Sequence, residues 1–408
     1  MSSDHRQILL RIFQSALAAV NGRVCVRGFL KQHSIVAPVY LLSIGKAACG
    51  MAQGAHDILS ADIVEALVIT KQGYAESLPW PVREAGHPLP DADSLAAGQE
   101  LLDFTARIPR HANVLVLLSG GASALVEVLP PGVTLNTLRA VNDWLLASGL
   151  DIAAMNRLRK QLSCLKGGRL AQRLFPRPVL CLAISDVPGD DPCVIGSGPL
   201  VADPMLSLSG HLSALPEFVR DALRHHLPAP PVNDDCFRSV RLEIIATLDT
   251  AKRAAFDAAQ QLGYRAALQQ EFITGDSIAA GSRLATQLLG SPRGEIQIWG
   301  GETSLVLPPH PGCGGRNQSL ALAAAQVLAG HKDVWFLSAG TDGSDGPGSD
   351  TGALVDGGTI ARGAQEGYKA ASALAAADAG SFLEASGDLI QTGPTGTNVM
   401  DLMIGLRA

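Results

Sequence analysis

Lys46 and Arg316 each stand where an apolar run turns into a helix-like stretch, and both residues could bind an anion. Lys46 lies in LLSIGKAACGMA among small and apolar neighbours. The backbone N–H groups of a helix start already favour negative charge there. Arg316, which follows Gly315, can fork onto phosphate or carboxylate oxygens. The alternatives, a solvated lysine and a surface arginine, fit these neighbours less well. Glu302 ends the preceding strand-like run, on the same expected rim.

Aspartates follow two other apolar runs, in loops rich in glycine. The segment CLAISDVPGDDPCVIGSGPLVADP holds Asp186 at the end of a run and Asp190 shortly after it. Either carboxylate could hold a divalent cation or accept a hydroxyl proton, and either could equally be a turn-forming or capping residue. A third candidate, Asp342, lies in SAGTDGSDGPGSDTGALVD. That segment resembles an EF-hand only superficially, because no glutamate stands at the twelfth position.

The segment NVLVLLSGGASAL predicts a buried strand that stops at Ser119, Gly120 and Gly121 and continues as a helix. Such turns often hold phosphate groups. This one lacks the lysine of a P-loop, and Ser123 lacks the second glycine of a hydrolase nucleophile elbow. Ser123 is better explained as a residue that caps the helix. We interpret the turn as a neutral set of backbone N–H and hydroxyl donors for an anion.

Composition excludes several classes of protein. The 408 residues are 47% hydrophobic and 17% charged, with a net charge of -6, and they contain no long Lys/Arg run. We therefore expect no nucleic-acid partner. No apolar run approaches the ~18 residues of a membrane span, and the first twenty residues predict an amphipathic helix, so we expect a cytoplasmic protein without a membrane partner. Seven cysteines without a CxxC pair argue against structural zinc and a disulfide framework.

Short apolar runs alternate with helix-like stretches along the whole chain. This alternation predicts an α/β fold with parallel sheets covered by helices on both faces. Ligands of such sheets bind at the carboxyl ends of the strands, where the loops described above lie. The proline-rich segment 225–235 predicts a boundary near residue 235, with about four strands before it and about three or four after it. The predicted strands are 38–45, 65–70, 113–121, 178–186, 241–247, 295–301 and 333–340, and the predicted helices are 47–59, 93–106, 134–149, 249–262, 275–289 and 316–329.

A series of motifs, in the same order along nearly the whole chain, resembles glycerate 2-kinases. This is the glycerate kinase family with a MOFRL-type C-terminal domain, whose members often carry the name hydroxypyruvate reductase. The motifs are LSIGKAA, AGHPLPDADS, LLSGGASAL, NRLRKQLSCLKGGRLA, SDVPGDDPCVIGSGP, GGETS, GGRNQ, GTDGSDGP and TGPTGTNV.

The resemblance implies ATP-dependent phosphorylation of D-glycerate at its 2-hydroxyl, giving 2-phosphoglycerate, with Mg²⁺ on the phosphates. It implies a doubly wound, Rossmann-like N-terminal domain of residues 1–235 and a smaller α/β MOFRL-type domain of residues 236–408. The last ~15 residues are expected to pack back on the first domain, and the active site is expected in the cleft between the domains. D-glycerate and ATP are the expected small-molecule partners, and a homodimer is a candidate assembly.

The resemblance also assigns roles to the loop residues. Lys46 and Arg316 match the family's catalytic lysine and arginine, which would act together on domain closure. Asp186 is the third catalytic candidate, and Asp190 and Asp342 are candidates for holding Mg²⁺. The candidates for holding ATP or glycerate are Ser119, Gly120, Gly121, Ser123, Gly196, Ser197, Gly198, Glu302 and Asn317.

Two departures from the family and two rival functions remain. Many members follow GGRNQ with glutamate where this chain has Ser319. The segment IIATLDTAKRAA, residues 244–255, resembles the family's usual glycine-containing loop less closely, which argues against ligand contacts by residues 247–250.

Two other functions are alternatives to the kinase. One is an NAD(P)H-dependent hydroxypyruvate reductase, although no G-x-G-x-x-G fingerprint is complete in this sequence. The other is a non-catalytic protein that binds a sugar acid or a nucleotide.

Overall fold

The computed structural model describes residues 2–150, 152–206 and 215–408. The chain forms two compact units, one of Gly22–Ile245 and one that combines the residues up to Asn21 with Ala246–Ala408. The division thus falls after the proline-rich segment predicted as the linker. Residues 240–246 form an edge strand of the first sheet, and this strand carries the chain past the predicted boundary near residue 235 before it enters the other unit.

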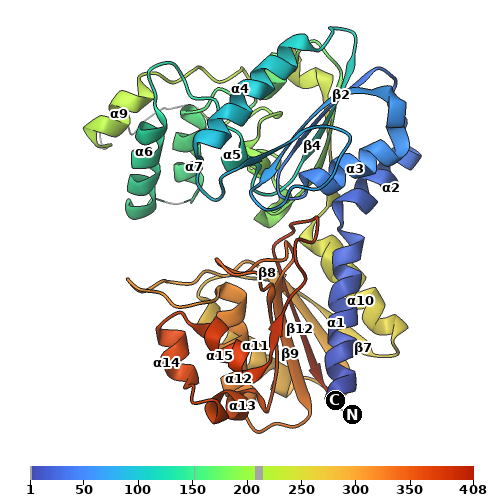
Figure 1. The fold of residues 1–408 in the computed structure, drawn as a ribbon, viewed down its shortest axis with the longest axis vertical. Helices are drawn as coiled ribbons and strands as arrows, with labels where there is room; N and C mark the ends of the chain where they lie inside the picture. Colours follow the sequence, from blue (N-terminus) through green and yellow to red (C-terminus); the bar gives the residue numbers. More distant parts are fainter. Residues whose placement is uncertain (1, 151, 207–214) are drawn as a thin grey trace. The chain divides into compact units, whose positions relative to one another are not determined.

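The unit Gly22–Ile245 contains a six-stranded sheet in the order β3-β2-β1-β4-β5-β6 (Figure 1). The pairs from β3 through β5 are parallel, which confirms the prediction for this part of the chain. All six residues of β1 are buried, because helices cover both faces of a parallel sheet. The strands are β1 (Val39–Ile44), β2 (Ile63–Lys71), β3 (Val82–Ala85), β4 (Asn113–Leu118), β5 (Val179–Ile184) and β6 (Val240–Ala246).

In this unit, three residues separate the end of β1 from α3 (Ala48–Leu59), and three separate the end of β4 from α5 (Ala122–Leu125). Helix α4 begins with a capping box, in which the Asp91 carboxylate accepts from the Ser94 backbone and the Ser94 hydroxyl accepts from the Asp91 backbone. Leu101 and Phe104 then face the sheet and are buried. The helices are α2 (Gly22–Gln32), α3 (Ala48–Leu59), α4 (Ala92–Arg107), α5 (Ala122–Leu125), α6 (Leu135–Ala147), α7 (Ile152–Gln161), α8 (Arg169–Leu174) and α9 (Glu217–Leu223).

The second unit also has six strands, in the order β11-β10-β9-β12-β8-β7. Only β7 and β8 are parallel among its pairs, so the prediction of a parallel sheet is wrong for this part of the chain. The C-terminal strand β12 lies in the middle of this sheet, between β9 and β8, so it belongs to the second unit. That the last ~15 residues also pack on the first domain stays a prediction. The strands are β7 (Arg265–Ile273), β8 (Glu295–Gly301), β9 (Val334–Gly340), β10 (Gly352–Asp356), β11 (Leu389–Ile390) and β12 (Asp401–Arg407).

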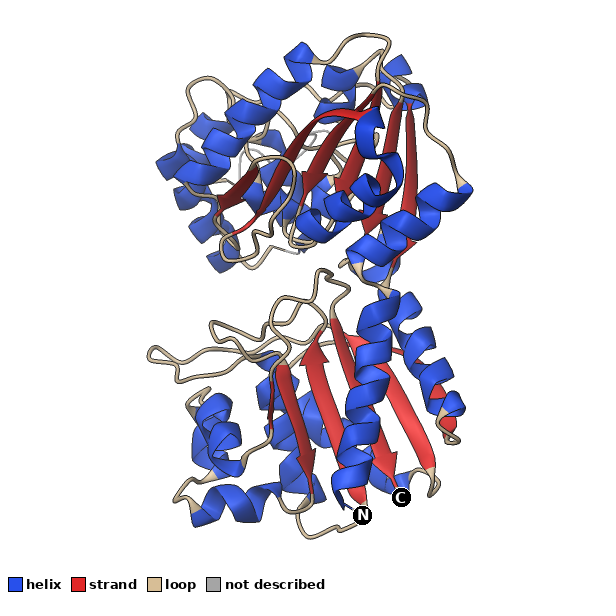
Figure 2. Cartoon of the chain, turned by 45° about the vertical axis from the view of Figure 1, so that its right-hand side comes forward, coloured by secondary structure: helices blue, strands red, loops and turns tan. Residues whose placement is uncertain are grey.

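Helices cover both faces of this second sheet (Figure 2). Helices α1 and α10 pack on each other, and α1 also contacts β9 and β12. Helix α12 packs on β9, β10 and α11, and almost all of its residues are buried, because alanines along it allow close approach on several sides. The helices are α1 (Ser2–Ala19), α10 (Leu248–Gln261), α11 (Ser277–Gly290), α12 (Arg316–Leu328), α13 (Thr359–Gln365), α14 (Ala370–Ala375) and α15 (Ala379–Ser386).

No single helix in the described part of the chain combines the length and apolar character that a membrane span requires. The bent pair Asp4–Ala19 and Gly22–Gln32 meets such a test only when its two helices are taken together.

The position of α1 generates a prediction. Phe13 of α1 is 1% exposed, so Phe13→Ala should lower the free energy of unfolding by about 3–5 kcal/mol. Hydrogen–deuterium exchange should become faster in β9 and β12 while β1 and β4 keep their protection. Val24→Ala, at an exposed position of α2, is the control. Faster exchange in β1 and β4 alone would contradict the assignment of α1 to the second unit.

Candidate functional site

Two predicted loops of the unit Gly22–Ile245 are brought together because β1 and β4 are parallel neighbours in register. The backbone N–H of Lys46 donates to the carbonyl of Gly120 at 2.9 Å. The backbone N–H of Ala47 donates to the Ser119 hydroxyl at 3.1 Å. The structure thus joins the lysine and the glycine turn, which lie far apart in the sequence, in one hydrogen-bonded corner.

Glycine is required at two positions of this corner. Gly45 has φ of 132°, and a Cβ there would overlap Ser119. Gly121 has φ of 85°, and a Cβ there would lie 3.1 Å from Cδ2 of His87 and 3.4 Å from Cγ of Lys46. The half-buried Lys46 side chain and His87 therefore both flank Gly121. Sequence reasoning did not single out His87, although the motif AGHPLPDADS contains it.

The second glycine turn lies against the first. The hydroxyls of Ser123 and Ser197 are 2.8 Å apart, within hydrogen-bonding distance. Ser123 does not cap the short helix α5, whose N-terminal flanking residue is Gly121. Gly196, Ser197 and Gly198 all have positive φ, of 56°, 66° and 60°, and for a serine this conformation is unusual. Together these turns line part of a cavity of about 420 Å³.

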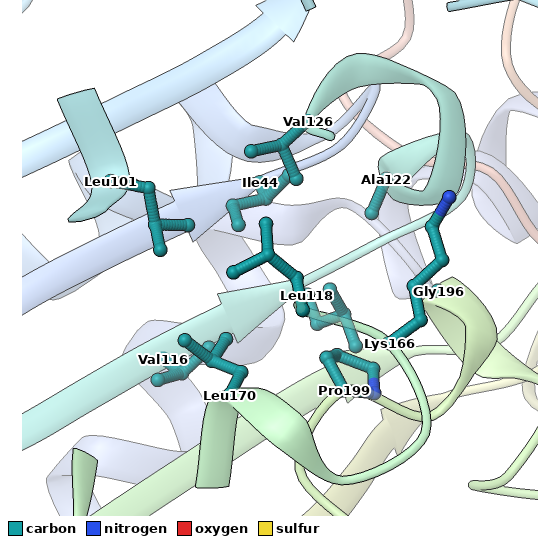
Figure 3. A pocket seen from close by; sticks show the side chains of 11 residues that line it. Ile44, Leu101, Val116, Leu118, Ala122, Val126, Lys166, Leu170, Gly196 and Pro199 are labelled. Atoms are coloured by element: carbon teal, nitrogen blue, oxygen red, sulfur yellow. The ribbon is translucent and has the colours of Figure 1, made fainter. Parts of the chain in front are cut away.

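The floor behind the turns is apolar. Figure 3 shows side chains of β1, β4 and α8 around a small cavity of about 20 Å³, among them Ile44, Leu118 and Leu170. A space of this size holds about one water molecule and offers few polar partners. We interpret this space as a small packing defect of the apolar core. The core around it packs beneath the two glycine turns.

The predicted aspartates of this unit lie at the end of β5. Asp186 is half-buried two residues after β5, and Asp190 has φ of 54° at the end of a 3-10 turn, Pro188–Asp190. The third predicted acid, Asp342, lies in the other unit. Among the residues that the structure describes, no group of three or more His, Cys, Asp or Glu side chains is arranged to hold a metal ion. The assignment of Mg²⁺ to Asp190 and Asp342 stays a prediction.

Arg316, in the second unit, is held by two carboxylates. Its Nε and Nη2 donate to the two oxygens of Asp401, at 2.7 and 3.0 Å, and its Nη1 lies 2.8 Å from Oε1 of Glu302. Asp401 is 1% exposed and opens β12, where it pairs with Gly301 and Gly340. Sequence reasoning missed Asp401, although it closes the last glycine-threonine loop.

A further acid fixes the start of helix α12. The carboxylate of Asp345 accepts from the backbone N–H groups of Asn317 and Gln318, at 3.0 and 2.8 Å. Asn317, predicted to contact a ligand, is 1% exposed and accepts a hydrogen bond from the Ser338 hydroxyl at 2.7 Å. The Asn317 side chain also hydrogen-bonds Asp401, the carboxylate that pairs with Arg316. Its contact with a ligand stays a prediction. Asp342 accepts from the backbone and the hydroxyl of Ser344, at 3.0 and 3.1 Å.

Burial dominates the electrostatics of this cluster. Burial raises the pKa of Asp345 to about 7, against the effect of its two backbone hydrogen bonds. Burial also raises the pKa of Asp401, although Arg316 opposes this change. Burial of Arg316 acts to lower its pKa, but the carboxylates of Asp401 and Glu302 outweigh it and raise that pKa further. Arg316 is a permanent cation in an acidic surrounding.

Both departures from the family pattern lie at the start of a helix. Ser319 is buried within α12, and its backbone N–H donates to Gly315 at 3.0 Å. Thr247 and Thr250 form a capping box at the start of α10. The threonines thus have a structural role without any ligand.

Comparisons with known proteins match both parts of the chain. A model of a domain of unknown function, DUF4147, matches residues 8–215, and the MOFRL family model matches residues 295–401. The D-glycerate 2-kinase of Thermotoga maritima is 37% identical over 388 residues, 90% of each chain. The glycerate 2-kinase of Pyrococcus horikoshii is 32% identical over 438 residues, 100% of this chain and 98% of its own. The crystal structure of the Thermotoga maritima glycerate kinase superposes with a TM-score of 0.86 at 33% identity, covering 100% of both chains.

The buried Asp345 generates a prediction about pH. Its pKa is higher in the folded protein than the ordinary 3.8, so its protonation stabilises the fold below about pH 4. This stabilisation is lost as the pH rises through 7, by at most about 1.4 kcal/mol per pH unit. Asp345→Asn cannot titrate, and the difference in melting temperature between wild type and variant should shrink from about pH 5 to about pH 8.

Asp276→Asn is the control, since Asp276 is an exposed carboxylate that also caps a helix, α11. It separates the loss of a cap from the loss of a buried titrating group. A difference between wild type and Asp345→Asn that stays constant across this pH range would contradict the raised pKa.

Proposed function

The chain belongs to the glycerate 2-kinase family, and we propose that it transfers a phosphoryl group from ATP to the 2-hydroxyl of D-glycerate, giving 2-phosphoglycerate and ADP. Its relatives of that name and the two matched family models support this activity. The observation that carries the proposal is the corner in which the Lys46 side chain flanks the Gly121 turn. A cation beside backbone donors is the arrangement that phosphoryl transfer requires, because catalysis consists mostly of positioning and charge stabilisation.

Lys46 is proposed to neutralise charge that develops on the transferred group. Its backbone is fixed by the hydrogen bond to Gly120, so the side chain starts from a defined position. The hydroxyls and backbone N–H groups of the turn at 119–121 would hold oxygens of the same anion. Asp186, half-buried after β5, is the proposed acceptor of the proton from the 2-hydroxyl of glycerate.

Arg316 is proposed as the second cation. A guanidinium has five N–H donors, and three of the Arg316 donors face Asp401 and Glu302. These contacts hold the side chain in one orientation while 34% of it remains exposed. The other donors fit the oxygens of a phosphate or a carboxylate. The carboxylates of Asp401 and Glu302 thus orient the guanidinium and also reduce the net positive charge around it.

Mg²⁺ is proposed as the metal of the reaction. Its donors in kinases are commonly one or two carboxylates together with the phosphates, so a cage made only of protein groups is not required. Asp190 and Asp342 supply carboxylates in the glycine-rich loops and fit this donor chemistry. When bound, Mg²⁺ would neutralise charge on the phosphates. ATP and D-glycerate are the proposed small-molecule partners.

Product identification tests the proposed function. Purified protein with ATP, Mg²⁺ and D-glycerate should give 2-phosphoglycerate, which ³¹P NMR separates from 3-phosphoglycerate. Hydroxypyruvate and NADH without coupling enzymes should show no change in absorbance at 340 nm. Robust oxidation of NADH would replace the kinase with the reductase, and ligand binding without ADP release would favour a non-catalytic protein.

Substitution of the two cations generates a further prediction. Lys46→Ala and Arg316→Ala should each lower kcat on the order of 10²–10³-fold, because each removes a group that stabilises charge in the transition state. A coupled assay of ADP release with D-glycerate measures this loss. Lys31→Ala, at an exposed lysine of α2, is the control. Wild-type turnover in either cation variant, with an unchanged circular dichroism spectrum, would remove that residue from the mechanism.

A further inference from the structure

A cavity of about 420 Å³ lies within the unit Gly22–Ile245 and extends beyond the two glycine turns. Its volume is in the range of pockets that bind organic ligands of moderate size. D-glycerate, a small hydroxy acid, would leave most of it empty. The cavity is also lined by Asn156, Arg159 and Lys166 of the motif NRLRKQLSCLKGGRLA, none of which has a role in the proposed mechanism.

Arg159 of this motif is a partly buried cation held only by neutral groups among the described residues. Its Nε donates to Oδ1 of Asn142 at 3.0 Å, and its Nη1 donates to Oδ1 of Asn156 at 3.4 Å. No carboxylate in the described part of the chain pairs with it, and burial lowers its pKa. The two amides orient the guanidinium without cancelling its charge, so an anion in the cavity would complete its contacts.

The other lysine and carboxylate in the lining cancel each other. Lys166 and Glu127 form an ion pair, with 8% and 1% of their side chains exposed. A buried pair of this kind contributes little net charge to a ligand site. The formal charge that remains in the lining is therefore the positive charge of Arg159.

The walls of the cavity differ in character. Leu138 and Leu146, two turns apart on α6, lie on the same side of the helix and both line the cavity together with Pro90. Asn142 stands between them on the same side, and its amide can both donate and accept hydrogen bonds. An apolar wall with an amide suits a heteroaromatic base, while Arg159 and the serines of the turns suit phosphates.

We propose that this cavity is the nucleotide site, with a phosphate of ATP on Arg159 and the base against Leu138 and Leu146. This inference rests on the proposed kinase function and adds the place where ATP binds. Arg159 acts in it as a binding residue and not as a group that takes part in the chemistry. Glycerate then binds outside most of this cavity.

Binding of ADP alone tests the inference independently of turnover. Isothermal titration of the full chain with Mg·ADP should show a Kd at least ~10-fold higher for Arg159→Gln than for wild type, since a charge-assisted contact is lost. Arg159→Lys should lie between the two, because it keeps the charge but not the fork. Arg139→Gln should bind ADP like wild type, because Arg139 is an exposed arginine of α6, the helix that carries Leu138 and Leu146, and does not line the cavity.

Leu146→Glu provides a second variant in case Arg159→Gln does not fold. Leu146 is 66% exposed, so the substitution should not disturb the core, yet it places a negative charge at the cavity wall. It too should weaken ADP binding. In steady-state assays, both variants should raise the KM for ATP and leave the KM for D-glycerate within ~3-fold of wild type.

The outcomes separate this inference from the proposed function. If wild type forms 2-phosphoglycerate but ADP binds equally well to wild type, Arg159→Gln and Leu146→Glu, the nucleotide site lies elsewhere and the inference alone is overturned. If only the KM for D-glycerate rises, the cavity holds the acceptor and the inference is again overturned. If ADP binding depends on Arg159 but no 2-phosphoglycerate forms, the nucleotide site stands and the proposed function fails.

Discussion

The parallel pairing of β1 with β4 determines where the chemistry of the unit Gly22–Ile245 lies. Two parallel strands in register end at the same edge, so the turns after them must share that edge. Gly45 and Ser119 come so close there that only glycine fits at position 45. The lysine, the glycine turn and the proposed nucleotide cavity all depend on this close approach.

The second unit holds the side chain of Arg316 in a fixed orientation at the edge of its core, with 34% of that side chain exposed. Asp401 supplies a bidentate partner from the central strand, and Asp345 fixes the first turn of α12 through two backbone N–H groups. Such acids are costly to bury, and the raised pKa of Asp345 reflects that cost. The arginine is positioned by an acidic cluster, whereas Lys46 is positioned by backbone hydrogen bonds.

The sequence predicts part of this fold well and part of it poorly. Runs such as NVLVLL are apolar throughout, so the buried strands of the parallel sheet are predictable, as are long helices with clear periodicity. Strand β7 mixes polar and apolar residues, β3 is short, and β12 contains a glycine, so local pattern does not mark them. Strand direction depends on which strands pair across the whole chain, and the local pattern does not contain this information. The alternation of strands and helices therefore predicts a parallel second sheet, whereas four of its five strand pairs are antiparallel.

Some residues of the candidate site can also be predicted from the sequence, and others cannot. Lys46, Arg316 and the glycine turns stand out in the sequence because their neighbours are glycine or small residues. Asp401 and Asn142 do not, because each acts through a partner far away in the sequence, Arg316 and Arg159. Ser123 was expected to cap a helix, and only the structure shows that its hydroxyl meets Ser197. Pairings between distant segments are the information that a single sequence lacks.

The placement of α1 gives the chain an inserted architecture. The chain begins in one unit, leaves it at Asn21, builds the whole of Gly22–Ile245, and returns at Ala246. During synthesis, the inserted unit can complete its sheet while α1 still lacks the strands that cover it, since domains generally fold as they emerge. Helix α1 packs on α10, β9 and β12, so Leu9, Ile12 and Phe13 are buried by elements that are synthesised after most of the inserted unit. Until β12 is synthesised, helix α1 therefore lacks part of the sheet on which it packs.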